Sequence, residues 1–167
     1  MGPSAFSFLK DQLRKFEIVF YLLGNHEAYG TTVLGARTTA RAFEHEMEEL
    51  RSLSGSTMGR FIFLDQTRFD LTDSVTVLGC THFSRISNEQ RESVALFCSD
   101  FSEIEDCTVD AHNSAHQSDL DWLNSQIENI ARHEQHRKIV VFTHHSPTML
   151  EAANFNELDL ILKRSRV

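Results

Sequence analysis

Two short stretches of the sequence place metal-binding or proton-donating side chains directly after an apolar run. Gly24-Asn25-His26-Glu27 follows the apolar residues 18–23, and Thr143-His144-His145 follows the apolar residues 139–142. An asparagine amide oxygen and an imidazole nitrogen both bind divalent transition metals well. A histidine that binds no metal can donate a proton to a leaving oxygen. The pattern predicts a metal site with an adjacent acid, and the alternative is ordinary turn chemistry after a strand.

Both apolar runs are rich in β-branched and aromatic residues and are short, which is typical of buried strands. In an open α/β sheet, ligands bind in the crevice beyond the carboxyl ends of the strands. Gly24 lets the backbone turn sharply at the end of the first run, which directs the following side chains into that crevice. We therefore expect Asn25, His26 and His144 to meet at one edge of the fold.

The rest of the chain alternates between helical and strand patterns, which predicts an α/β domain. We expect helices over residues 4–16, 39–53 and 120–130, and strands over residues 18–23, 61–64, 75–78 and 139–142. A capping-box pattern beginning at Ser118 predicts the start of the third helix. Residues 83–115 have no sustained period and are rich in polar side chains, so they are expected to form a surface insertion or long loop.

Length and composition restrict the class of protein. A chain of 167 residues predicts one domain, and its 41% hydrophobic and 24% charged residues are ordinary globular usage. The net charge of −8 argues against nucleic-acid binding, and the apolar runs are shorter than the ~18 residues of a membrane span. An odd number of widely spaced cysteines, Cys80, Cys98 and Cys107, favours reduced thiols and a cytoplasmic protein.

The two stretches resemble motifs of one known family. Residues 22–27, Leu-Leu-Gly-Asn-His-Glu, are similar to the Gly-Asn-His-[Asp/Glu] signature of the calcineurin-like metallophosphoesterases. Residues 140–147 resemble that family's later block of a strand followed by histidine, and residues 78–81 and 116–123 resemble its linking segments. The ordered set extends from about residue 16 to residue 148. The resemblance implies a β-sandwich flanked by helices, with two divalent metal ions (Mn, Fe or Zn) at one strand edge.

The resemblance also implies roles for individual residues. Asn25 would bind a metal through its amide oxygen, and His144 would bind it through its imidazole. His26 would stabilise the phosphoryl transition state or protonate the leaving group. The implied reaction is metal-dependent hydrolysis of a phosphomonoester or phosphodiester of a small molecule, with a metal-bridging water as the nucleophile.

Other parts of the family pattern are absent from this sequence. The chain has no Gly-Asp pair and no Gly-His pair, and its one Asp-x-His, Asp110-Ala111-His112, lies in the polar excursion and is interpreted as a coincidence. We therefore expect residues 1–167 to be one domain truncated at both ends, from which a targeting segment can be missing. Because two protein ligands bind a metal ion weakly, the chain is expected to hold metal weakly or not at all.

Two further hypotheses remain open from the sequence. One is a catalytically dead scaffold of the same family that serves as a binding module, and the other is an unrelated α/β protein. His82 follows an expected strand and is ambiguous. The remaining histidines lie in polar or helical surroundings and are expected to face solvent: His45, His112, His116, His133 and His136.

Overall fold

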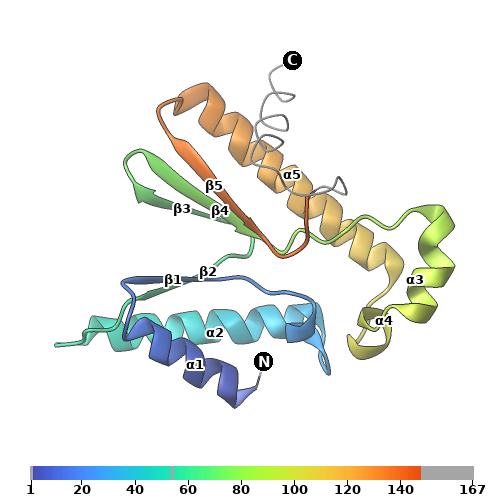
Figure 1. Ribbon diagram of the computed structural model, residues 1–167, viewed down its shortest axis with the longest axis horizontal. Coiled ribbons are helices and arrows are strands. Elements are labelled where there is room, and N and C mark those ends of the chain that lie inside the picture. The colour runs from blue at the N-terminus through green and yellow to red at the C-terminus, as the bar shows by residue number, and fades with distance from the viewer. Residues whose placement is uncertain (1, 54, 148–167) are drawn as a thin grey trace.

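The computed structural model describes residues 2–53 and 55–147 and has an α/β fold (Figure 1). The helices are α1 (Pro3–Leu13), α2 (Val33–Ser52), α3 (Arg91–Phe97), α4 (Asp100–Glu103) and α5 (Val109–His133), with 3-10 turns η1 (His26–Ala28) and η2 (Asn88–Gln90). The strands are β1 (Ile18–Tyr21), β2 (Arg60–Phe63), β3 (Thr67–Thr72), β4 (Val75–Cys80) and β5 (Lys138–Thr143). The expected α/β class is confirmed.

The strands form two small sheets. In the first, β1 pairs in parallel with β2, and in the second, β4 pairs antiparallel with β3 and parallel with β5. Cys80 at the end of β4 lies opposite Thr143 at the end of β5. Since parallel neighbours end at the same edge, the residues after β4 and after β5 leave the sheet side by side.

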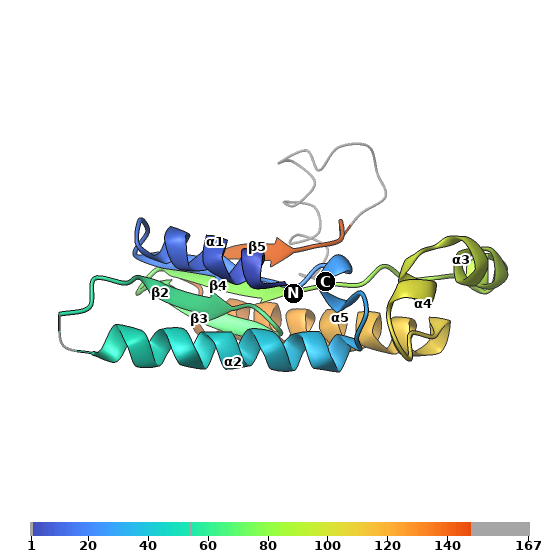
Figure 2. The ribbon, with the colours of Figure 1, turned by 90° about the horizontal axis from the view of Figure 1, so that it is seen from below.

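The two sheets pack against each other, and the helices cover their outer faces (Figure 1). Ile62 and Val77 form the centre of the contact between the sheets, where they pack with Phe20 and Phe69. Helices α1 and α2 cover the first sheet, while α5 covers the second. The result is a four-layer arrangement of helices, sheet, sheet and helix, with α3 and α4 extending beyond one end of the sheets (Figure 2).

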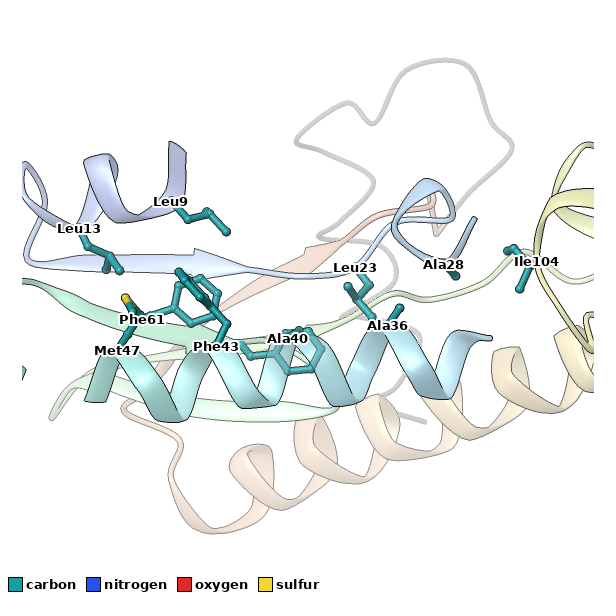
Figure 3. Packing of buried hydrophobic residues seen from close by; sticks show 11 residues of the cluster. Leu9, Leu13, Leu23, Ala28, Ala36, Ala40, Phe43, Met47, Phe61 and Ile104 are labelled. Atoms are coloured by element: carbon teal, nitrogen blue, oxygen red, sulfur yellow. The ribbon is translucent and has the colours of Figure 1, made fainter. Parts of the chain in front are cut away.

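The largest apolar cluster lies between α1, α2 and the first sheet. Figure 3 shows Leu9 and Leu13 of α1 facing Phe43 and Met47 of α2, with Phe61 of β2 between them. Burying these side chains supplies the hydrophobic stabilisation that keeps the first sheet in place. Across the described residues, no helix combines the length and the apolar composition that crossing a membrane requires.

Two helices begin earlier than the sequence pattern predicts. Helix α2 begins at Val33 because the Thr32 hydroxyl accepts a hydrogen bond from the Gly35 N–H at 2.9 Å. Helix α5 begins at Val109, where Thr108 accepts from the Ala111 N–H at 3.1 Å, so the predicted start at Ser118 is wrong. Both first turns pack on the core through only a few side chains, among them Ala36 and Val109, so they carry a weaker apolar period than the rest of each helix.

The sequence pattern also missed β3 and much of the structure in residues 83–115. Strand β3 is half exposed, and its largest apolar contact is Phe69, so it carries no continuous apolar run. Residues 83–115 contain η2, α3, α4 and the first turns of α5, rather than a long irregular loop alone. These short helices bury few side chains, and Leu96 and Phe97 on α3 are strongly exposed. A helix that buries few side chains needs no periodic apolar residues, so the sequence pattern does not predict these short helices.

An ion-pair network fastens β3 to the end of α5. Arg68 on β3 donates hydrogen bonds to both carboxylate oxygens of Glu134, at 2.8 and 2.7 Å, and Arg137 donates to the same carboxylate. The hydrogen bonds from these two arginines, of which the one from Arg68 has the larger effect, lower the pKa of Glu134 from an ordinary 4.5 to about 2. Arg68 also pairs with Asp70 on its own strand. The ionised form of Glu134 is therefore favoured in the folded protein.

We predict that this network contributes stability that disappears in acid. Because the folded pKa of Glu134 is depressed, its contribution is fully present above the unfolded value of 4.5 and is lost as pH falls toward 2. The difference in free energy of unfolding between the wild type and Glu134→Gln, measured by urea denaturation, should be constant near neutral pH and shrink across that window. The exposed Glu128→Gln variant, which removes a simple surface pair, is the control. A difference that stays constant down to pH 2 would contradict the prediction.

Candidate functional site

The fold brings Asn25 and His144 together although they are 119 positions apart in the chain. Asn25 lies directly before η1, and His144 follows β5. The His144 Nε2 and Asn25 Oδ1 atoms are 3.1 Å apart. Phe20 of β1 and Phe142 of β5 stack at 5.9 Å between ring centroids, so the packing of the two sheets carries the ends of these strands toward each other.

Thr81, the residue after β4, holds both strand ends in place. Its hydroxyl donates to the Leu23 carbonyl at 3.0 Å, and its own carbonyl accepts from the N–H groups of His144 and His145 at 3.2 and 3.3 Å. The side chain is buried, so these bonds are shielded from competing water. Thr81 thus links the segment after β1 in one sheet to the segment after β5 in the other.

Gly24 makes room for the His144 ring. A Cβ atom at this position would lie 2.5 Å from Cε1 of His144 and 2.8 Å from its Nε2. Those separations are far inside van der Waals contact, so any larger residue at position 24 must displace the ring. Position 24 therefore requires glycine, because the His144 ring fills the space that a Cβ atom would occupy.

The buried carboxylate of Asp100 fixes the orientation of Asn25. Asn25 Nδ2 and the Tyr29 hydroxyl both donate to Asp100 Oδ1, each at 2.7 Å. An ionised carboxylate only accepts, so the amide must present its NH₂ to Asp100 and its carbonyl oxygen to His144. Asp100 is 8% exposed, and its hydrogen bond raises the pKa of Tyr29 to about 12. The amide oxygen of Asn25 is thereby aimed before any ligand arrives.

Helix α4, which carries Asp100, is fixed by backbone hydrogen bonds on both sides of a turn. The Gly30 N–H donates to the Glu103 carbonyl at 2.8 Å, and the Glu105 N–H donates to the Thr31 carbonyl at 2.9 Å. Gly30 has φ of 74°, a left-handed conformation that glycine adopts without strain. Neither Asp100 nor Tyr29 could be identified from the sequence, because Asp100 lies among many acidic residues of the 83–115 segment and no local pattern separates it from them.

His26 lies next to the Asn25–His144 pair, and its ring packs on a different residue. It is exposed at the start of η1, and its ring packs on Tyr29 with centroids 4.7 Å apart. It also lines a groove between α1 and β1, together with Phe8 and Val19. Of the three predicted site residues, the structure brings Asn25 and His144 into contact and leaves His26 beside them, open to solvent.

Four further histidines gather around Phe83 at the same end of the fold. His112 and His116 of α5 bond the carbonyls of Ser84 and Phe83, so the expectation that they face solvent is wrong. His82 is buried, and burial is the main cause that lowers its pKa and those of His112 and His145. The exposed positions expected for the other three are confirmed: His45, His133 and His136. The Asp110-Ala111-His112 triplet lies in the first turn of α5, where His112 holds the segment after β4.

A second buried carboxylate, Asp119 on α5, positions the turn after β4. It is 1% exposed and accepts hydrogen bonds from the His82 N–H at 2.8 Å and from Gln66 Nε2 at 2.9 Å. His82 has φ of 54°, which is unusual for a residue with a side chain. The hydrogen bond that the His82 N–H donates to the Asp119 carboxylate stabilises this conformation and so supports Thr81 next to it. The capping-box pattern of residues 118–121 includes Asp119 but predicts only a helix start, and no local pattern marks this carboxylate as buried.

In the described part of the chain, no group of three or more His, Cys, Asp or Glu side chains is arranged to hold a metal ion. In comparisons with known proteins, no family model, no curated protein and no solved structure matches the chain. The geometry of the Asn25–His144 pair and its supporting carboxylates is therefore the basis for any functional inference.

We predict that Gly24→Ala separates His144 from Asn25 without unfolding the protein. The new Cβ requires the ring to move, and His144 is exposed enough to swing into solvent, so the cost in stability should be small. The His144 ring and Asn25 side-chain amide resonances should both shift in NMR spectra. Gly2→Ala, which meets no atom within 4 Å, is the control. Unchanged His144 and Asn25 resonances in Gly24→Ala would contradict the close approach.

Proposed function

We propose that this chain is part of a calcineurin-like phosphoesterase domain in which Asn25 and His144 bind one divalent cation and the domain hydrolyses phosphate esters of small molecules. The observation that carries the proposal is the 3.1 Å separation of Asn25 Oδ1 and His144 Nε2. The four-layer arrangement supports it, since a β-sandwich flanked by helices is the fold that the sequence resemblance implies.

The ligand atoms fit a shared cation. Metal–ligand distances of about 2.0–2.2 Å place two neighbouring ligand atoms of one ion roughly 3.0–3.5 Å apart. The observed pair lies in that range, and both atoms are donors that Mn, Fe and Zn accept. The carboxylate of Asp100, one hydrogen bond behind Asn25, adds a favourable negative charge. A complete site of this family would hold two ions, and we propose that this chain by itself binds metal weakly.

Different residues of the chain would have different roles in hydrolysis. A bound cation would polarise a phosphoryl oxygen of the substrate. Asn25 is pre-oriented for it by Asp100 and Tyr29, which lowers the entropy cost of forming the site. His26 is exposed next to Asn25 and would donate a proton to the leaving-group oxygen.

The second candidate function is a binding module that keeps the scaffold without the chemistry. It is favoured by the absence, among the described residues, of any larger cluster of metal-binding side chains. On this alternative, the Asn25–His144 contact is a structural hydrogen bond between two strand ends. In the phosphoesterase, Asn25 Oδ1 and His144 Nε2 would bind a metal ion in place of their hydrogen bond. In the binding module, they would keep that hydrogen bond when a metal ion is added.

We further propose a cytoplasmic location, which rests on the cysteines. Cys80, Cys98 and Cys107 are all free thiols in the structure, and Cys80 is buried. Reduced cysteines are typical of a compartment in which disulfides do not persist.

Calorimetric titration of the chain with Mn²⁺ tests the phosphoesterase proposal. Asn25→Ala and His144→Ala should each weaken binding by roughly tenfold or more, because each removes one of two protein ligands. Asn129→Ala and His133→Ala, exposed residues of α5, are matched controls that should leave the affinity unchanged. His26→Ala should also leave Mn²⁺ affinity unchanged, because His26 is proposed as a proton donor and not as a metal ligand. Binding that none of the variants affects, or no saturable binding, would favour the scaffold alternative.

A further inference from the structure

A groove of about 520 Å³ runs between α1 and β1 and reaches His26. Its walls are mainly apolar side chains from both elements: Ala5, Phe8 and Leu9 on α1, and Val19, Phe20 and Tyr21 on β1. Successive side chains of a strand point to opposite faces, so a groove lined by three consecutive residues follows the edge of that strand. Strand β1 pairs with β2 along one edge, and the groove follows the other. The volume suits a small organic molecule.

Phe8 supplies apolar surface that the protein leaves open. It is 61% exposed, whereas Leu9 is 7% exposed because it packs in the cluster between α1, α2 and the first sheet. Helix α1 and β1 run in opposite directions (Figure 1), so the N-terminal part of α1 lies beside the end of β1 that leads to His26. An apolar ligand that covers Phe8 removes this surface from water, which is favourable.

The charges along the groove disfavour an anionic occupant. Among the described residues that line it, none is a lysine or an arginine, and Glu27 contributes a carboxylate that accepts from the Gly24 N–H at 2.8 Å. The basic side chains of α1, Lys10 and Arg14, line a different groove, between α1 and α2. A further phosphate group, such as that of a nucleotide, would meet a negative charge here without a compensating cation. A neutral apolar body meets no such penalty.

His26 joins this groove to the Asn25–His144 pair. It lines the groove, it follows Asn25 directly in the chain, and its ring packs on Tyr29 with centroids 4.7 Å apart. The Tyr29 hydroxyl donates to the same oxygen of Asp100 that holds the Asn25 amide, so His26 contacts a residue of the hydrogen-bond network that orients Asn25. An oxygen that accepts a proton from His26 would therefore have the groove beside it for the rest of its molecule.

We propose that this groove binds the leaving group of the substrate, and that the substrate is the phosphate ester of an apolar alcohol or phenol. The inference rests on the proposed function, in which His26 protonates the leaving oxygen. A water oxygen forms the new bond to phosphorus as the bond to the alcohol oxygen breaks. The proton that His26 gives to the alcohol oxygen is replaced by one from the water, and a monoester yields the alcohol and inorganic phosphate.

The test is an NMR titration of the metal-free chain with 4-ethylphenol, an alcohol product of this class. It should bind saturably and shift resonances of Ala5, Phe8 and Val19, and the ring protons next to its hydroxyl should give an NOE to the His26 ring. The polar alcohol myo-inositol should bind at least roughly tenfold more weakly. Equal affinity for the two alcohols, shifts confined to other parts of the chain, or an NOE to His26 from the ethyl group alone would overturn the proposal.

Variants place the ligand in the groove. Phe8→Ala removes the exposed apolar wall and should weaken binding of 4-ethylphenol by roughly tenfold. Phe16→Ala is the matched control, because Phe16 is 58% exposed and lies outside the groove, so it should leave the affinity unchanged. Both side chains are exposed, so both variants should fold. An equal loss of affinity in the two variants, or no loss in Phe8→Ala, would contradict the proposal.

This titration uses no metal ion and no turnover, so its outcome is separate from that of the Mn²⁺ titration. Loss of 4-ethylphenol binding with Mn²⁺ binding at Asn25 and His144 intact would overturn the groove assignment and leave the phosphoesterase proposal standing. Binding of 4-ethylphenol in a chain that binds no Mn²⁺ would overturn the role of the groove as a leaving-group site, because that role rests on hydrolysis.

Discussion

The arrangement of this molecule depends on the junction that Thr81 makes between its two sheets. A buried hydroxyl bonds the segment after β1, and the carbonyl of the same residue bonds the segment after β5. Without that junction the apolar contact between the sheets would still hold them together, but it would not fix where their strand ends lie. Apolar packing is non-directional, whereas a hydrogen bond sets a register. The Asn25–His144 pair forms because both kinds of interaction act at one edge.

Two buried carboxylates hold the residues of this edge in position through hydrogen bonds. Asp119 supports the turn next to Thr81, and Asp100 orients the amide of Asn25. Buried carboxylates are costly unless their oxygens accept hydrogen bonds, so each of them constrains the groups around it. Asp119 accepts hydrogen bonds on both of its oxygens, and Asp100 accepts two on its Oδ1.

The sequence predicted the parts of the fold whose signals are local. The apolar runs gave β1, β2, β4 and β5, and the polar residues after β1 and β5 identified Asn25 and His144 as a pair that would meet. Strand β3 was missed because it is partly exposed, and the first turns of α2 and α5 were missed because they bury only a few side chains, such as Ala36 and Val109. Asp100 and His112 were missed for another reason. Their roles depend on contacts across 75 and 28 residues, and no local pattern encodes such a contact.

The central claim is that Asn25 and His144 share one cation, and paramagnetic broadening by Mn²⁺ tests it most directly. Substoichiometric Mn²⁺ added to isotope-labelled protein broadens resonances in order of their nuclei's distance from the bound ion. The account predicts that the Asn25 side-chain amide and the His144 ring broaden first, followed by Gly24 and Thr81. Broadening that begins elsewhere, at exposed carboxylates such as those of Glu48 and Glu49 on α2, would contradict it.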